Sequence, residues 1–380
     1  MPDAARAKRV LIVGVSTRAM AESAARAGYD VTALDAFGDL DQHPAVRALS
    51  MPRDFGVAFS ARAVASVAAE LERDAVAYLS PFENHPTAVR RLAARGALWG
   101  NVASVLKRAR DPQALAGSHE RPRFNDTTRW LIKPRASGGG HGIRWWQPGN
   151  AVPSSAHVQP FIGGTSGSIV FAAARGNAVP LGLTRQLVGD PDFGADGFRY
   201  CGSILGPAND AQFERDANLF EAAVRLASTL TRELGLVGVN CIDFVACDGV
   251  PVPVEVNPRW SASMELAERG YGVSVFGAHA VACDTGDLPV FDLGHARARG
   301  CALGKAIVFA RHDVICGDTT SWLDDTTVRD VPHPGERIPA GKPVCTVFAH
   351  GADAAACHVA LVARAASVYE VLDSWARVAV

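Results

Sequence analysis

Two carboxylates and one amide occur at a spacing that suits a hard metal ion. Asp243 lies in an apolar run that ends at the Asp-Gly pair 248–249, and Glu255 and Asn257 lie in the next apolar run. Asp-Gly between apolar runs predicts a β-hairpin, in which alternation places Glu255 and Asn257 on one face with Asp243 opposite. Carboxylate and amide oxygens are ligands that Mg²⁺ prefers. The alternative is a polar hairpin facing solvent, but Glu255 interrupts an otherwise apolar strand, where an unpaired carboxylate would be costly.

Two basic residues could act on phosphate groups near this hairpin. Lys133 ends an apolar run and is followed by Ser137 and the glycine-rich segment 138–142. An ammonium group neutralises phosphate oxygens, and a glycine-rich turn exposes backbone N–H groups to them. The segment is not a Walker A motif, and a merely flexible hairpin is the alternative. Arg259, two residues after Asn257, could stabilise the charge on a transferring phosphoryl group.

Further polar residues could bind substrates. Ser16 and Arg18 begin a helix after the first strand, where free backbone N–H groups could hold a carboxylate or phosphate, or Ser/Thr could act only as an N-cap. Glu83 and Asn84 follow another strand and could bind an amine, or could be exposed loop residues. Arg185 could pair with a carboxylate through two hydrogen bonds, or lie on the surface.

Composition excludes several classes of protein. The chain has 380 residues, 48% hydrophobic and 20% charged, which indicates a folded protein of two or three domains. Its 38 Lys and Arg balance 39 Asp and Glu, so no basic footprint for nucleic acid or an anionic membrane is expected. No apolar run approaches the ~20 residues that span a bilayer, and no signal peptide is recognised. We therefore expect a cytoplasmic enzyme with no nucleic-acid or membrane partner.

All eight cysteines lie in the second half of the chain, without a Cys-x-x-Cys pair. We expect them to be reduced and mostly buried rather than catalytic or metal-binding.

The first hundred residues alternate strand and helix patterns, which predicts a parallel sheet of α/β class. The turn after the first strand has Gly14 but lacks the further glycines of a dinucleotide-binding motif. The remainder is expected to combine antiparallel strands with helices. Its expected elements are strands within 129–147 and 157–170, a helix at 209–234, a hairpin at 237–256, strands at 302–310 and 344–349, and a last helix at 354–372, with an interdomain connection at about 107–125.

The order of these motifs resembles the ATP-grasp enzymes, in particular their carboxylate–amine ligases. The resemblance covers most of the chain and includes the hinge-like stretch 157–164, and its most specific part is Asp243 followed by Glu255-Val-Asn-Pro-Arg259. It implies an ATP-grasp fold of α/β and α+β class. The implied parts are an N-terminal Rossmann-like pre-ATP-grasp domain (1–110), a small subdomain with the glycine-rich loop (111–163), a large subdomain with the magnesium site (164–298) and a small C-terminal β-rich region (299–380).

The resemblance also implies roles for individual residues. Asp243, Glu255 and Asn257 would hold Mg²⁺, with Mn²⁺ as an alternative, and Arg259 and Lys133 would act on the transferring phosphoryl group. The residues implied to bind ATP are Lys107, Lys133, Ser137, Gly138, Gly139, Gly140, His141, Gly142, Gln159, Pro160, Phe161 and Ile162.

Two departures from the family pattern affect the nucleotide contacts. Many members carry Gln-Glu at the hinge, where this chain has Gln159 and Pro160. The family also has an earlier nucleotide-binding lysine, for which Lys107 is the only nearby candidate.

The implied activity is an ATP- and Mg²⁺-dependent ligase. It would activate a small carboxylate, glutamate or another amino acid, as an acyl phosphate and couple it to an amine. The alternatives are a phosphotransferase or a carboxylase with the same nucleotide site, and a nucleotide-binding regulator without turnover. In general appearance the chain is similar to the group containing tyramine–glutamate ligases of coenzyme biosynthesis. The implied partners are small-molecule carboxylate and amine substrates, with a homodimer as an open alternative.

Overall fold

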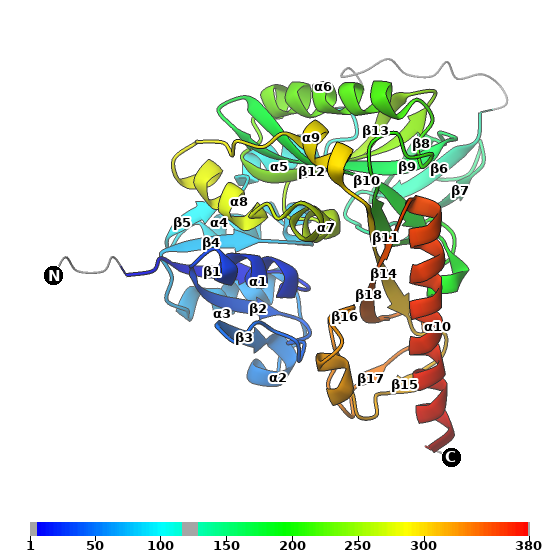
Figure 1. Cartoon of the computed structure of the whole chain (residues 1–380). Helices are drawn as coiled ribbons and strands as arrows, with labels where there is room; N and C mark the ends of the chain where they lie inside the picture. The colour runs from blue at the N-terminus through cyan, green and yellow to red at the C-terminus, as the bar shows by residue number, and fades with distance from the viewer. Residues whose placement is uncertain (1–5, 116–127, 379–380) are drawn as a thin grey trace.

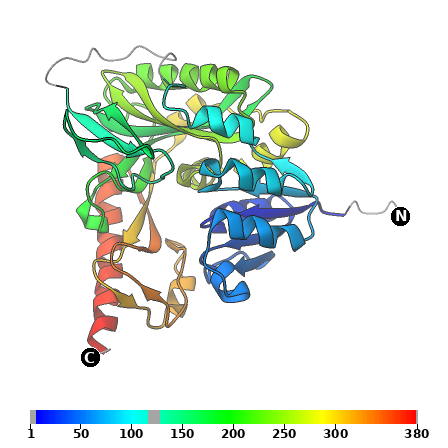
Figure 2. The ribbon, with the colours of Figure 1, turned by 180° about the vertical axis from the view of Figure 1, so that it is seen from behind.

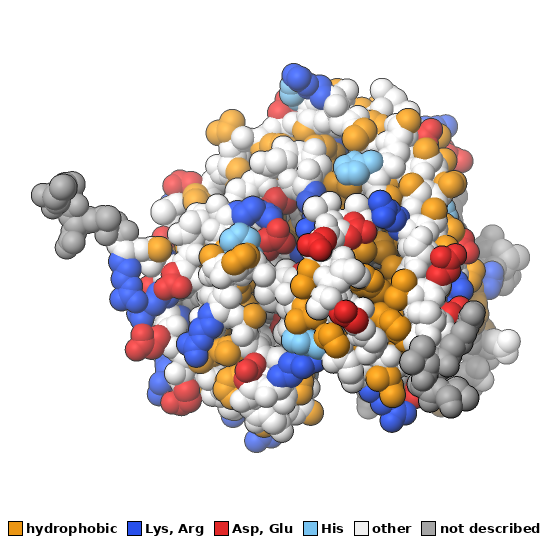
Figure 3. All heavy atoms as spheres, turned by 60° about the horizontal axis from the view of Figure 1, so that its bottom comes forward, with side chains coloured by type: hydrophobic (Ala, Val, Ile, Leu, Met, Phe, Trp, Pro, Cys, Tyr) orange, Lys and Arg blue, Asp and Glu red, His pale blue; other side chains and the backbone are white. Residues whose placement is uncertain are grey.

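The computed structural model describes residues 6–115 and 128–378, so part of the expected connection at 107–125 lies outside the described residues. The chain forms a parallel N-terminal sheet, a small three-stranded sheet and a large eight-stranded sheet (Figure 1). This arrangement confirms the expected mixture of α/β and α+β structure. On the face shown in Figure 3, Lys and Arg side chains are interspersed with Asp and Glu.

The N-terminal sheet has five parallel strands in the order β3-β2-β1-β4-β5. Its strands mostly alternate with helices, as expected for the first hundred residues. The elements are β1 (Arg9–Val13), α1 (Arg18–Arg26), β2 (Asp30–Asp35), β3 (Val46–Ser50), α2 (Met51–Phe55), α3 (Ala61–Val67), β4 (Ala75–Tyr78), α4 (Pro86–Leu92), β5 (Ala97–Trp99) and α5 (Ala103–Ala109). The edge strands β3 and β5 were not expected, because β3 has exposed residues in the middle and β5 has only three residues.

The small sheet contains β6 (Trp130–Pro134), β7 (Arg144–Trp146) and β8 (Ala156–Pro160), all antiparallel. Strands were expected within 157–170, and the two that form there belong to different sheets. The chain leaves the small sheet after Pro160, and β9 (Thr165–Ala174) belongs to the large sheet. Gly164 lies at this change, with a φ of 145° and so little space that a Cβ would come within 2.1 Å of the carbonyl oxygen of Ala246.

The large sheet has the strand order β13-β12-β9-β10-β11-β14-β18-β16. Its strands are β9, β10 (Asn177–Val188), β11 (Tyr200–Leu205), β12 (Gly238–Cys247), β13 (Val250–Asn257), β14 (Ala302–Phe309), β16 (Val328–Arg329) and β18 (Pro343–Gly351). The C-terminal strands therefore continue the sheet that carries the 237–256 hairpin.

Alternation along β9 gives this sheet two apolar faces. Ile169 and Phe171 pack with α6 (Asp216–Leu234) on one face. Val170 and Ala172 pack with α7 (Ala262–Tyr271) and α8 (Val275–Asp284) on the other, in a core that also contains residues of β1 and α1. Because one core includes both sheets, the N-terminal domain is packed against the large sheet through α7 and α8. The helix expected from residue 209 begins only at Asp216, after Arg215 in the left-handed region.

The remaining C-terminal elements are α9 (Leu293–Arg299), β15 (Val314–Ile315), β17 (Arg337–Ile338) and α10 (Ala354–Val378). Figures 1 and 2 show these C-terminal strands beside the N-terminal domain, below the large sheet. Backbone contacts join the two parts, because the N–H of Leu40 donates to the carbonyl of Val331 at 2.9 Å.

By length and composition alone, α10 could cross a membrane, since Ala354–Trp375 has a mean hydropathy of 1.4. No apolar run of that length was expected from the sequence. In this structure Leu361, Ala365 and Leu372 are buried in the core formed with β14 and β18, and Arg364 and Glu370 lie on the exposed side.

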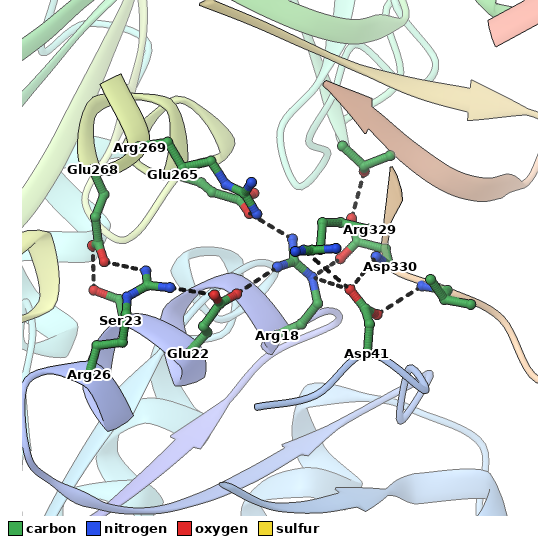
Figure 4. A network of polar contacts seen from close by, with 12 residues as sticks. Arg18, Glu22, Ser23, Arg26, Asp41, Glu265, Glu268, Arg269, Arg329 and Asp330 are labelled. Carbon is green, nitrogen blue, oxygen red and sulfur yellow. Dashed lines mark hydrogen bonds and ion pairs between the residues drawn. The ribbon is translucent and has the colours of Figure 1, made fainter. Parts of the chain in front are cut away.

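Arg18 is the cation that connects the three parts of the molecule (Figure 4). Its side chain is fully buried and bonds Glu22 on α1 at 3.1 Å, Glu265 on α7 at 2.9 Å and Asp330 of the C-terminal segment at 2.7 Å. Asp41 lies 3.5 Å away. Burial lowers the pKa of Arg18, but the facing carboxylates raise it more, so the guanidinium remains charged.

Arg18→Gln should lower the free energy of unfolding by about 3–5 kcal/mol, because several buried carboxylates lose their common partner. Arg53→Gln is the matched control. Arg53 also links the N-terminal domain to the C-terminal part, through Glu336 at 2.9 Å, but its side chain is 41% exposed and should contribute at most about 1 kcal/mol. Denaturant unfolding measures both changes, and equal decreases in the free energy of unfolding of the two variants would contradict this role of Arg18.

His279 makes a second link between the parts. Its Nδ1 accepts a hydrogen bond from the N–H of Val239 at 3.0 Å, and its Nε2 lies 3.3 Å from the carbonyl oxygen of Trp99. The ring is buried, and burial lowers its pKa to about 4. Protonation at Nδ1 would place a proton against a backbone donor, so the folded state holds the neutral ring.

Stability should therefore fall as the pH is lowered. The unfolded chain protonates His279 near its ordinary pKa of about 6.5, whereas the folded chain does so near 4. The stabilisation is fully present above pH 6.5 and should weaken by about 2 kcal/mol between pH 7 and pH 5. Denaturant unfolding at pH 7 and at pH 5 measures this difference, and the His279→Gln variant should lack the loss of about 2 kcal/mol. An identical pH dependence in both proteins would refute the prediction.

Candidate active site

The β-hairpin expected at 237–256 forms in the structure. β12 and β13 are antiparallel, Asp243 lies opposite Glu255, and Nδ2 of Asn257 donates to Asp243 at 2.7 Å. The turn residues Asp248 and Gly249 have φ values of 52° and 77°, the conformation for which Asp-Gly is suited. The hairpin thus places two carboxylates and an amide in one cluster.

Asp243 is the most electrostatically perturbed of the three. Burial, and then the nearby Glu255 carboxylate, raise the pKa of Asp243 to about 6. Gln186 on β10 donates to its Oδ1 at 2.8 Å. Because two close carboxylates in a buried site repel each other, a bound cation would stabilise both in their ionised form.

These residues fit Mg²⁺. Within the described parts of the chain, no group of three or more His, Cys, Asp and Glu residues has metal-binding geometry. Mg²⁺ typically takes only one or two protein carboxylates and completes its shell with water and nucleotide phosphates. Asn257 is less available as a metal ligand, because its Oδ1 accepts a hydrogen bond from Arg259 at 3.1 Å.

Two cations adjoin the carboxylates. Lys133 at the end of β6 donates to the carbonyl of Val254 at 3.3 Å; burial lowers its pKa, whereas Glu255 and Asp243 raise it. Arg110 forms an ion pair with Glu255 and donates to the carbonyl of Ser137 at 2.9 Å. Both cations line a cavity of about 150 Å³ that also contains Glu255.

Lys107 does not join this group. Its side chain is exposed beside a separate surface hollow that also includes Val89 and Arg90. Lys107 lies on the exposed side of α5, whereas Arg110 follows the last helical residue, Ala109, and its guanidinium pairs with Glu255. The prediction from the sequence named a lysine alone, although arginine also binds phosphate.

The glycine-rich segment lies over the cavities. Tyr200 N–H donates to the carbonyl of Gly139 at 3.1 Å, and a Cβ at Gly140 would come within 1.8 Å of the carbonyl oxygen of Phe198. Gly140, with a φ of 77°, therefore has to be glycine for the segment to approach this loop. Ser137, Gly138, Gly139 and Gly140 line the cavities, whereas His141 and Gly142 are exposed and do not.

The hinge residues Gln159, Pro160 and Ile162 line both cavities, and Phe161 lines the larger one. His157, at the start of the same stretch, has a buried Nδ1 without a hydrogen-bond partner in the structure. Burial, and then Lys133, lower the pKa of His157, so the ring is neutral at neutral pH.

Arg259 connects the hairpin to the N-terminal domain. Its Nη2 lies 2.7 Å from Oε1 of Glu83, which is fully buried. Burial raises the pKa of Glu83, but the adjacent guanidinium of Arg259 lowers it below its ordinary value. Glu83 thus positions Arg259 rather than lying free in a loop, and Asn84 lines neither cavity.

A larger cavity, of about 650 Å³, extends from the carboxylate cluster to the junction of the three parts. Ser16 and Arg18 line it, but Thr17 donates its side-chain hydroxyl to Asp35 at 2.7 Å instead of capping the helix. Arg185 lies outside it. Side chains alternate along β10, so the neighbouring residue Gln186, which the sequence analysis missed, lines the cavity instead.

A family model described as an ATP-grasp domain matches residues 104–263. The chain contains an ATP-grasp domain. The match extends from α5 to the start of α7 and includes the glycine-rich segment, the hinge, the hairpin and Arg259. No curated protein matches the sequence.

Solved structures share this fold over nearly the whole chain. An L-amino acid ligase from Bacillus licheniformis is 15% identical, with a TM-score of 0.62 over 97% of this chain and 98% of that one. An N5-carboxyaminoimidazole ribonucleotide synthetase in complex with ADP is 15% identical, with a TM-score of 0.64 over 97% of both chains. A biotin carboxylase from Campylobacter jejuni is 11% identical, with a TM-score of 0.66 over 92% of this chain and 88% of that one. The similarity shows the ATP-grasp fold, and the solved structures that share it include both ligases and carboxylases.

The contrast between Arg110 and Lys107 can be tested by kinetics. Arg110→Met should raise the KM for ATP at least tenfold, because a charge-assisted contact to phosphate is lost. Lys107→Met, three residues before Arg110 and on the outer surface, should leave the KM for ATP unchanged. Thermal unfolding of both variants controls for folding, and similar KM values for the two would contradict the placement of Arg110.

Proposed function

We propose that this protein is an ATP- and Mg²⁺-dependent ligase that activates a small carboxylate as an acyl phosphate and joins it to an amine. The observation that carries the proposal is a single cavity that begins at Asp243, Glu255 and Lys133 and continues past Arg259 into a separate space. The first part suits Mg·ATP, and the second has room for further substrates. We place the reaction in the cytoplasm, with small molecules as substrates.

In the first step an oxygen of the substrate carboxylate attacks the γ-phosphorus of ATP, and ADP leaves. Asp243 and Glu255, with Asn257, would hold Mg²⁺, which neutralises phosphate charge when it is bound. Lys133 and Arg110 bind phosphate oxygens from the opposite side. Arg259, held in place by Glu83, orients the carboxylate beside the phosphoryl group.

In the second step the amine nitrogen attacks the acyl carbon. Inorganic phosphate leaves, and the nitrogen releases a proton as the amide forms. Water would compete with the amine, so the site must be covered while the acyl phosphate exists. The glycine-rich segment supplies this cover, because Gly139 and Gly140 contact the loop at Phe198 and Tyr200 across the opening.

The experiment is a screen for ADP release with pairs of carboxylates and amines, amino acids first. A ligase releases ADP and phosphate only when both substrates are present. Release that depends on bicarbonate would instead identify a carboxylase, and a stable phosphorylated product would identify a phosphotransferase. Either of these outcomes would overturn the proposal.

Glu255→Gln provides the matching test of the metal site. The change preserves shape but removes one charge, so turnover should fall at least a hundredfold with little change in thermal unfolding. Glu233→Gln on the exposed face of α6 is the control and should have wild-type activity. Full activity of Glu255→Gln would refute its role.

A further inference from the structure

The end of the larger cavity farthest from the hinge is formed by charged residues of three parts of the chain. We call this surface the far wall; it consists of Arg18, Glu265, Lys305, Asp330 and Thr346. These residues come from α1, α7, β14, the segment after β16, and β18. None of them lies within the matched ATP-grasp residues 104–263.

The far wall exposes one sign of charge. The side chains of Arg18, Glu265 and Lys305 are 0%, 5% and 6% exposed, and they bond one another within the wall. Asp330 is 26% exposed, so it is the far-wall charge that a ligand in the cavity can reach. A ligand group at this place therefore meets a carboxylate rather than a cation.

The Asp330 carboxylate is held firmly. Its Oδ1 accepts from Nε of Arg18 at 2.7 Å, and its Oδ2 accepts from the hydroxyl of Thr346 at 2.5 Å. Each oxygen has a second lone pair, so the carboxylate can still accept hydrogen bonds from a ligand. Burial raises the pKa of Asp330, but Arg18 and Lys305 lower it below its ordinary value, so the group is ionised at neutral pH.

The backbone at Asp330 is also unusual. Its φ is 57°, in the left-handed region that residues with side chains seldom adopt. Asp41 holds this conformation, since its two oxygens accept from the N–H groups of Asp330 and Val331 at 3.1 and 2.9 Å. The N-terminal domain thus fixes a strained residue of the C-terminal part at the edge of the cavity.

We propose that Asp330 binds the protonated amino group of a substrate, so that this ligase takes a substrate carrying a primary ammonium group. The inference rests on the proposed function and names the substrate chemistry of the same cavity. Asp330 is a binding residue, and Thr346 and Arg18 position it. The ammonium group could belong to the carboxylate that is activated or to the amine that is coupled, and the experiment distinguishes the two.

The test uses Asp330→Asn in the full-length protein. The KM for the ammonium-bearing substrate should rise at least tenfold, while the KM for ATP stays within twofold, because one charge-assisted hydrogen bond is lost. The matched control is Glu22→Gln, which removes another carboxylate from Arg18 but does not line the cavity. A purely structural role for Asp330 predicts similar stability and kinetics for both variants, and that result would overturn the proposal.

Hydroxylamine, which is neutral at pH 7.5, can replace the amine and trap the acyl phosphate as a hydroxamate. If Asp330→Asn has the wild-type KM for the carboxylate in the hydroxylamine assay but a raised KM for the amine in the ADP-release assay, the ammonium belongs to the amine substrate. If the KM for the carboxylate rises in both the hydroxylamine and the ADP-release assays, the ammonium belongs to the carboxylate substrate. Absence of hydroxamate with the wild-type protein would count against the proposed function itself, independently of Asp330.

Analogues keep the proposal testable if Asp330→Asn fails to fold. With the wild-type protein, replacing the amino group by hydrogen or by a hydroxyl should raise the KM of a carboxylate substrate by a similar factor. For an amine substrate, whose analogue cannot react, the change should raise the inhibition constant above the KM of the amine by that factor. Equal constants for the amino and hydroxyl compounds would overturn the inference.

Discussion

The buried guanidinium of Arg18 is the interaction on which the assembly of this molecule depends. A cation without solvent contact is costly unless carboxylates surround it, and here they come from α1, the segment after β2, α7 and the C-terminal segment. Removing any one part would leave the charges of the others incompletely paired. The ionic cluster therefore gives the three parts one preferred arrangement, and the apolar core between α1, α7 and α8 supplies the packing around it.

The chemistry of the site depends on that arrangement at two points. Arg259 follows the metal-binding hairpin, but its guanidinium is held by Glu83 of the N-terminal domain. Asp330 lies in the C-terminal part, but Arg18 and Asp41 of the N-terminal domain determine where its carboxylate lies. A shift of the N-terminal domain would thus displace Arg259 and Asp330 together.

The sequence predicted those parts of the site that depend on local geometry. The hairpin with Asp243 and Glu255 is specified by its turn residues, but a β-bulge between Asp243 and Phe244, which alternation does not predict, brings Asp243 opposite Glu255. Lys107 and Arg185 failed for a different reason. Each was chosen by residue type. Arg110, just past the end of α5, reaches the cavity instead of Lys107, and alternation along β10 places Gln186 rather than Arg185 at the cavity.

Contacts between distant segments could not be derived in this way. Arg18 is separated by 247 residues from Glu265 and by 312 from Asp330, and no local pattern relates them. The sequence analysis singled out Arg18 as a ligand group at a helix N-terminus. In the structure its donors are occupied by carboxylates, so its effect on a substrate is exerted through Asp330.

Local and distant contacts also correspond to two different proposed roles, phosphoryl transfer and the choice of substrate. Lys133, Asp243, Glu255 and Arg259 all lie within residues 104–263, which match the ATP-grasp domain model. The far wall lies outside them and is built from α1, α7 and the C-terminal strands. Because binding and phosphoryl transfer are assigned to different segments, a substitution in the far wall can change which substrate is held without moving the phosphate-binding groups. The rigid ion pairs behind Asp330 make such a change selective, since they hold the carboxylate in place and leave only its outer lone pairs to the substrate.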